Sequence, residues 1–109
     1  MSKKKVGKCQ HFDSVVFIAD TYGFRTQSER CVDEMGELVR ALNRHLVYVS
    51  GLPFASYDMV SQSRSFIIDK MSEVQILLWQ LSYLLNCGGE ILDSIDKKLY
   101  EQVSYISLE

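Results

Sequence analysis

Apolar residues recur at helical spacing along the chain, and no segment alternates long enough between apolar and polar residues to predict a β-sheet. Residues 26–49 and 64–87 carry the two longest patterns, in which steps of three and four residues place apolar side chains on one face. The first stripe comprises Cys31, Met35, Leu38, Leu42, Leu46 and Val49, and the second comprises Ile67, Met71, Val74, Leu78, Leu81 and Leu85. We expect two long helices that pack through these stripes.

Two shorter helices are expected on either side of this pair. Residues 12–22 show a weak helical pattern that ends near Gly23. Residues 90–106 place five apolar side chains on one face, namely Leu92, Ile95, Leu99, Val103 and Ile106. The run Ser50-Gly-Leu-Pro-Phe-Ala-Ser between the long helices predicts a loop. Together these patterns predict an all-α protomer of the four-helix-bundle type.

Helix boundaries are predicted from residues that satisfy free backbone groups at helix ends. Thr26 or Ser28 can cap the start of the first long helix, and Ser63 or Ser65 can cap the second. Gly88-Gly89 predicts the end of the second long helix, because glycine readily takes the left-handed conformation common after a helix.

The composition fits a single globular domain. Its 109 residues are 47% apolar and 24% charged, with a net charge of −2 that attracts neither nucleic acid nor an anionic membrane. We expect a basic, flexible tail at 1–11 and one domain at 12–109. No segment is long and apolar enough to cross a bilayer. Three cysteines without a Cys-x-x-Cys motif fit reduced thiols, so we expect a cytoplasmic protein.

A ten-residue acidic segment occurs twice in the chain, once in each long helix. DEMGELVRAL at 33–42 and DKMSEVQILL at 69–78 share their aspartate, methionine, glutamate and leucine positions. The most conspicuous difference between them is a reversed charge, with Glu34 matched by Lys70.

The two acidic segments lie in the same register relative to their apolar stripes. On a helical wheel aligned on each stripe, Glu34 and Lys70 both lie at about 300°. Glu37 and Glu73 follow on their own helices at about 240°. Antiparallel packing through the stripes would therefore bring both flanks to one shared groove.

Facing carboxylates of this kind are typical of a magnesium site. Glu34 and Glu37 are neighbours on one helix, and carboxylates facing them across a groove would repel unless positive charge lay between them. Mg²⁺ takes oxygen ligands and commonly binds carboxylates together with substrate phosphates. The alternative is that Glu34, Glu37 and Glu73 are simply the solvated edges of two helices beside their apolar stripes.

These motifs resemble those of the MazG-like all-α nucleoside triphosphate pyrophosphohydrolases, a family that includes the dimeric dUTPases. The family carries Glu-Glu-x-x-Glu on one helix and Glu-x-x-Asp on the next. Here the first motif reads Asp33-Glu34-Met35-Gly36-Glu37, within a segment similar to small MazG-like proteins of phages and bacteria. The second reads Asp69-Lys70-Met71-Ser72-Glu73, with lysine where a ligand glutamate is expected. The resemblance covers roughly residues 20–106.

The resemblance implies a helical protomer that forms a homodimer or homotetramer and hydrolyses a nucleoside triphosphate to the monophosphate and pyrophosphate with Mg²⁺. It implies that Glu34, Glu37 and Glu73 are catalytic and bind the metal, with Asp69 a candidate replacement for the missing ligand. A dimer is also expected from the pattern itself, because outward-facing Leu77, Trp79 and Leu84 leave apolar surface exposed.

Lys70 leaves three interpretations open, because lysine donates hydrogen bonds and cannot ligate Mg²⁺. Asp69 could take the ligand's place, or Lys70 could bind phosphate as a point charge with slow hydrolysis. Alternatively, Lys70 neutralises the glutamates, and the fold persists as a helical oligomer that binds a nucleotide or a protein partner. Arg30, suited to phosphate, and Trp79, able to stack on a base, are the remaining substrate-binding candidates. Mg²⁺-dependent hydrolysis is the leading hypothesis and the binding oligomer is the alternative.

Overall fold

The structure, a computed structural model, describes residues 11–51 and 55–108. Across these ranges it contains three α-helices and no strand: α1 (Phe12–Val49), α2 (Tyr57–Leu84) and α3 (Gly88–Ser107). The all-α prediction is confirmed. The predicted basic tail, apart from His11, lies outside the described residues, as does Pro53 of the predicted loop.

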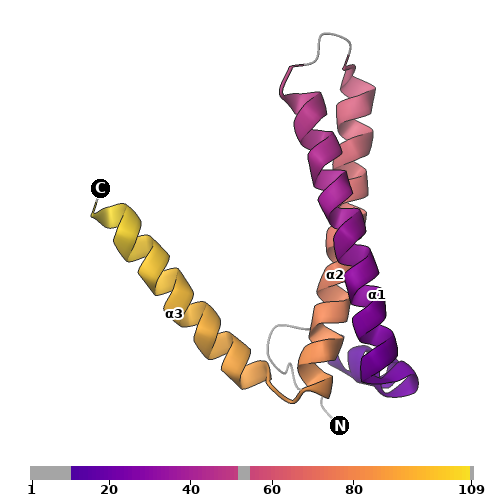
Figure 1. Ribbon diagram of the computed structural model, residues 1–109, viewed down its shortest axis with the longest axis vertical. Coiled ribbons are helices and arrows are strands. Elements are labelled where there is room, and N and C mark those ends of the chain that lie inside the picture. Colours follow the sequence, from indigo (N-terminus) through magenta and orange to yellow (C-terminus); the bar gives the residue numbers. More distant parts are fainter. Residues whose placement is uncertain (1–10, 52–54, 109) are drawn as a thin grey trace.

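The helices form a hairpin with one detached arm (Figure 1). α1 and α2 run antiparallel and make most of the contacts between helices, as the two stripes predict. α3 meets α2 only near their junction and then leaves the hairpin at a wide angle (Figure 1). In the described part of one chain, the expected four-helix bundle is therefore not closed.

α1 is broken at Gly23, close to where the first short helix is predicted to end. Gly23 has φ +86° and ψ 170°, a conformation that is essentially restricted to glycine. The segment before it turns back against the C-terminal end of α2, where the Tyr83 hydroxyl donates to the Asp20 carboxylate at 3.0 Å. Phe12 packs edge to face on the same tyrosine ring, with centroids 6.4 Å apart. Helical conformation resumes after Gly23, so Thr26 and Ser28 lie inside the helix, and their prediction as caps is wrong.

α2 begins at Tyr57, earlier than the predicted residue 64. Its cap is Ser56, whose hydroxyl accepts the backbone N–H of Met59 at 3.1 Å. The prediction of Ser63 or Ser65 as the cap is wrong, because residues 57–63 already belong to the helix.

The end of α2 also differs from the prediction. Asn86, with φ +52°, takes the left-handed conformation, and its N–H donates to the Tyr83 carbonyl at 3.0 Å. Asparagine tolerates this conformation better than most residues, so the turn does not need glycine. Gly88 and Gly89 instead open α3.

The core of the hairpin is rotated relative to the predicted stripes. Cys31, Ile67 and Val74 are buried as expected, but the small side chain of Ala41 lies between the helices in place of larger residues. Leu38 and Leu81 are half-buried. The remaining seven predicted members stay 42–60% exposed, namely Met35, Leu42, Leu46, Val49, Met71, Leu78 and Leu85. Small side chains at the contact allow the two backbones to approach closely, which places the larger residues along one side of the hairpin.

Two polar pairs, one buried and one partly buried, fix the register of α1 against α2. Gln27 and Gln80, 1% and 2% exposed, are joined by an amide–carbonyl hydrogen bond of 2.6 Å. Nearer the loop, His45 Nδ1 lies 2.7 Å from the Ser63 hydroxyl. Because unpaired buried polar groups are costly, any slip of the helices would destabilise the hairpin at both levels.

α3 is amphipathic but buries none of its side chains. Its apolar residues Ile95, Leu99, Val103 and Ile106 are 43–68% exposed. Among the described residues, no helix has both the length and the hydropathy that a membrane span requires.

The break at Gly23 yields a test of the fold. Gly23→Ala should destabilise the chain by about 1–3 kcal/mol, because an alanine at φ +86° is strained even though no atom obstructs its Cβ. Gly36→Ala is the matched control, since Gly36 is in mid-helix and the nearest atom to an added Cβ is Arg40 Nη1 at 4.0 Å. That change should stabilise by about 0.5–1 kcal/mol. Urea unfolding measures both, and effects of the same sign would contradict the break.

Candidate functional site

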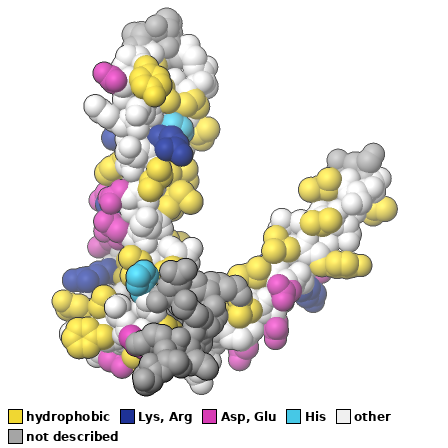
Figure 2. All heavy atoms as spheres, turned by 180° about the vertical axis from the view of Figure 1, so that it is seen from behind, with side chains coloured by type: hydrophobic (Ala, Val, Ile, Leu, Met, Phe, Trp, Pro, Cys, Tyr) yellow, Lys and Arg dark blue, Asp and Glu magenta, His cyan; other side chains and the backbone are white. Residues whose placement is uncertain are grey.

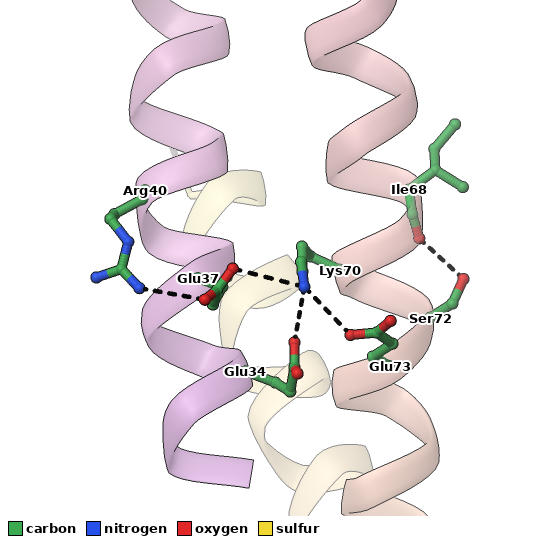
Figure 3. A network of polar contacts seen from close by, with 7 residues as sticks. All are labelled: Glu34, Glu37, Arg40, Ile68, Lys70, Ser72 and Glu73. Atoms are coloured by element: carbon green, nitrogen blue, oxygen red, sulfur yellow. Dashed lines mark hydrogen bonds and ion pairs between the residues drawn. The ribbon is translucent and has the colours of Figure 1, made fainter. Parts of the chain in front are cut away.

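The two acidic motifs meet on one side of the hairpin, as the shared register predicts (Figure 3). Glu34 and Glu37 project from α1, and Lys70 and Glu73 project from α2. The helical pairing of the two stripes thus brings together residues that are 36 positions apart in sequence. We call these four side chains the acidic cluster.

The Lys70 ammonium occupies the centre of the acidic cluster. Its Nζ lies 3.1 Å from Glu34 Oε1, 3.3 Å from Glu73 Oε1 and 3.5 Å from Glu37 Oε1. The Lys70 side chain is only 13% exposed, whereas the glutamates at the rim are 29–45% exposed. Two of the three donors of the ammonium form hydrogen bonds to Glu34 and Glu73, and Glu37 pairs with it by charge.

Hydrogen bonding within the cluster separates the pKa values of its members. The bond with Glu73, and then that with Lys70, lowers the pKa of Glu34. The same bond with Glu34 raises the pKa of Glu73. For Lys70, the hydrogen bond to Glu34 is the main cause of a pKa above its ordinary 10.5. The ammonium is therefore fully charged at neutral pH.

Asp69 lies outside the cluster. It is exposed on α2, while Ser72 of the same motif donates to the Ile68 carbonyl at 2.8 Å. A second cation, Arg40, approaches Glu37 at 3.6 Å from the exposed rim (Figure 3). The structure therefore brings Glu34, Glu37 and Glu73 together, as predicted, but surrounds them with basic side chains and not with a fourth carboxylate.

The side chains of the acidic cluster do not fit Mg²⁺ as they are placed. The Lys70 ammonium lies within 3.5 Å of an oxygen of each glutamate, at the point that a shared cation would occupy. Among residues 11–51 and 55–108, no group of three or more His, Cys, Asp or Glu side chains is placed to hold a metal ion. Electrostatic repulsion between an ammonium and a divalent cation disfavours both at one centre.

A shallow pocket of about 350 Å³ adjoins the acidic cluster. Its walls combine apolar, amide and charged side chains: Ile18, Gln27, Arg30, Asp33, Glu34, Glu73, Ile76, Leu77 and Gln80. The predicted Arg30 is present in this wall, with its guanidinium 4.7 Å from the centre of the Tyr22 ring. Trp79, the other predicted substrate contact, is half-buried on α2 and does not line the pocket.

The glutamine pair in the pocket wall was missed by the sequence reasoning. Gln27 precedes Cys31 by one helical turn and so continues the apolar stripe, which makes a polar residue there unusual. That interruption is the signal that could have identified it. The Oε1 atom of Gln27 is buried without a hydrogen-bond partner in the described structure, which is a local cost to stability.

Comparisons with family models, with curated proteins and with solved structures returned no match for this chain.

Removing the central ammonium should destabilise the hairpin. Lys70→Met leaves three carboxylates facing one another, so its midpoint of thermal unfolding at pH 7 should fall well below that of the wild type. Arg40→Met is the matched control, because it removes an exposed cation that pairs with the same Glu37 and should have little effect. Similar unfolding midpoints for the two variants would show that the central position of Lys70 does not contribute to the stability of the hairpin.

The stability difference between wild type and Lys70→Met should depend on pH in a defined way. A raised lysine pKa contributes stability below 10.5 that is lost as pH rises through the folded value. The lowered pKa of Glu34 contributes stability above 4.5 that is lost as pH falls through its folded value. Glu73 acts oppositely, since its raised pKa favours the folded state only in acid. The difference in unfolding free energy between wild type and Lys70→Met should therefore be constant around neutral pH and become smaller in acid. Urea unfolding of both proteins at a series of pH values measures this difference.

Proposed function

We propose that the chain is a MazG-like helical protein that acts by self-association and binding, and that does not carry out Mg²⁺-dependent hydrolysis. The observation that carries the proposal is the Lys70 ammonium, which lies within 3.5 Å of three glutamates contributed by two helices. An acidic cluster with its own internal cation can link α1 to α2 without a metal.

The charges around the pocket disfavour a nucleoside triphosphate as its ligand, which argues against hydrolysis. Arg30 is the one basic side chain among the residues of the pocket wall, which also carries Asp33, Glu34 and Glu73. A triphosphate brings several negative charges, and without a divalent cation these would be repelled by the carboxylates. The charge of Lys70 is already paired with three carboxylates of the cluster, so it does not offset this repulsion.

The exposed apolar surface supports self-association. Much of the large hydrophobic side-chain surface of the hairpin and of α3 is open to solvent in the single chain. Contiguous patches of this kind mark interaction sites in soluble proteins. Leu77, which was expected to face outward, is buried, whereas Trp79 and Leu84 are half-buried. A homo-oligomer is accordingly part of the proposal.

A second candidate function is hydrolysis of a nucleoside triphosphate to its monophosphate and pyrophosphate. It is favoured by one specific feature, the convergence of Glu34, Glu37 and Glu73 beside a pocket that also contains Arg30. For this function Lys70 would have to leave the centre of the cluster when substrate binds.

Pyrophosphate release separates the two candidates. Purified protein, incubated with each common ribonucleoside and deoxyribonucleoside triphosphate and Mg²⁺, should release none above background. Lys70→Glu supplies a fourth carboxylate in place of the ammonium and should be the variant in which Mg²⁺ raises the thermal midpoint.

Variants at the glutamates provide the control. Release by the wild type that is abolished by Glu34→Gln and by Glu73→Gln would overturn the proposal in favour of hydrolysis. Pyrophosphate release that persists in both variants would indicate a contaminating enzyme. The proposal would then require that further purification separates this activity from the protein.

A further inference from the structure

Two apolar surfaces of the described chain have no partner. The first, which we call the hairpin face, consists of side chains from α1, α2 and the C-cap of α2 that are 42–60% exposed: Met35, Val39, Leu42, Leu46, Met71, Leu78 and Leu85. The second, which we call the α3 stripe, consists of side chains that are 41–68% exposed: Ile91, Ile95, Leu99, Val103 and Ile106.

The hairpin face lies on the side of the hairpin opposite to the acidic cluster. On the wheels that place Glu34 and Lys70 at about 300°, Leu42 lies at about 20° and Met71 at about 40°, beyond the buried contact between the helices. In an antiparallel pair, equal angles on the two helices point to the same side. The hairpin is therefore charged on one side and apolar on the other.

The α3 stripe faces the space between α3 and the hairpin. Figure 2 shows hydrophobic side chains along the side of α3 that is turned toward this space, and charged side chains along its outer side. The same view shows hydrophobic side chains on the part of the hairpin that borders this space. The hairpin and α3 thus form a V whose two arms are apolar on their inner sides.

The solvent-accessible surface of the chain is larger than expected for a compact monomer of this size. The accessible surface is 8446 Å², about 2,200 Å² more than the roughly 6,200 Å² expected for a compact protein of 12.5 kDa. The radius of gyration is 17.7 Å, against about 13 Å for a compact chain of this length. Two chains that covered this excess would together bury about 4,400 Å², which is in the range of obligate interfaces.

We infer that the V is filled by the hairpin of a second copy of this chain, so that two copies interlock and the α3 stripe of each packs on the hairpin face of the other. The dimensions agree, because the α3 stripe from Ile91 to Ile106 is about 22 Å long and the α1 part of the hairpin face, from Met35 to Leu46, is about 17 Å long. A two-fold arrangement buries both surfaces at once, since each copy supplies one V and one hairpin.

This inference specifies the self-association in the proposed function, and it concerns the side of the hairpin away from the acidic cluster. Its failure is therefore distinguishable from failure of that proposal. Pyrophosphate release would remove the proposal that the chain does not hydrolyse nucleotides and leave the interlocked dimer intact. A monomeric chain would remove the dimer together with the self-association in the proposed function, and would leave intact the argument that Lys70 takes the place of a metal ion.

Light scattering coupled to size-exclusion chromatography tests the inference. The wild type should have twice the 12.5 kDa mass of one chain over a wide concentration range. Val103→Glu in the α3 stripe and Leu42→Glu in the hairpin face should each weaken the dimer by roughly 100-fold or more, because each would bury an unpaired carboxylate. Ser94→Glu and Asn43→Glu add the same charge at exposed positions outside both surfaces and should leave the mass unchanged.

Three outcomes would overturn the inference. A wild-type mass of one chain at every concentration, with a radius of gyration near 13 Å, would show that α3 folds back onto its own hairpin. Loss of the dimer in Leu42→Glu but not in Val103→Glu would show that α3 takes no part in it. If both glutamate variants lose their helical circular dichroism, amide hydrogen exchange of the wild type decides, because protection of α3 that does not fall on dilution would contradict a dimer.

Discussion

The hairpin depends on one ammonium group placed among three carboxylates. Without Lys70, helix pairing would force Glu34, Glu37 and Glu73 together at close range with no compensating charge. With it, the same pairing gives α1 and α2 a charged link at mid-length, between the buried amides of Gln27 and Gln80 at one level and His45 with Ser63 at another. Polar contacts at three levels thus determine how the two helices align.

That choice of contacts has a consequence for the rest of the chain. Because α1 contributes small and polar side chains to its contact with α2, namely Gln27, Cys31 and Ala41, its larger apolar residues such as Met35, Leu42 and Leu46 stay exposed. A hairpin held in this way buries little apolar area by itself, and α3 adds almost none. The exposed apolar side chains of the hairpin and of α3 therefore favour association with another protein surface.

Helical periodicity was sufficient to predict the class of the fold, the two long helices and the meeting of their acidic flanks. It could not predict which part of a broad apolar stripe is buried, because Cys31 and Leu42 lie close together on the wheel and only their partners on α2 decide between them. The end of α2 was predicted at the wrong residue because Gly88 and Gly89 are the more obvious helix terminators in the sequence. In the structure Asn86 takes the left-handed conformation that ends the helix.

The sequence identified the residues of the candidate site better than their roles. Glu34, Glu37, Lys70 and Glu73 converge as their spacing predicts, but spacing alone could not show that the ammonium points between the glutamates while Asp69 stays exposed. That distinction depends on side-chain directions across two helices. Gln27 and Gln80 were missed because each is read singly as an ordinary polar residue, and their meaning appears only when the helices pair.

Isothermal titration of the wild-type chain with MgCl₂ tests most directly whether Lys70 holds the place of a cation. The account predicts no saturable binding at millimolar Mg²⁺, because the central position is filled by the ammonium. Saturable binding of a metal ion by each chain, lost when Glu34 or Glu73 is changed to glutamine, would contradict it.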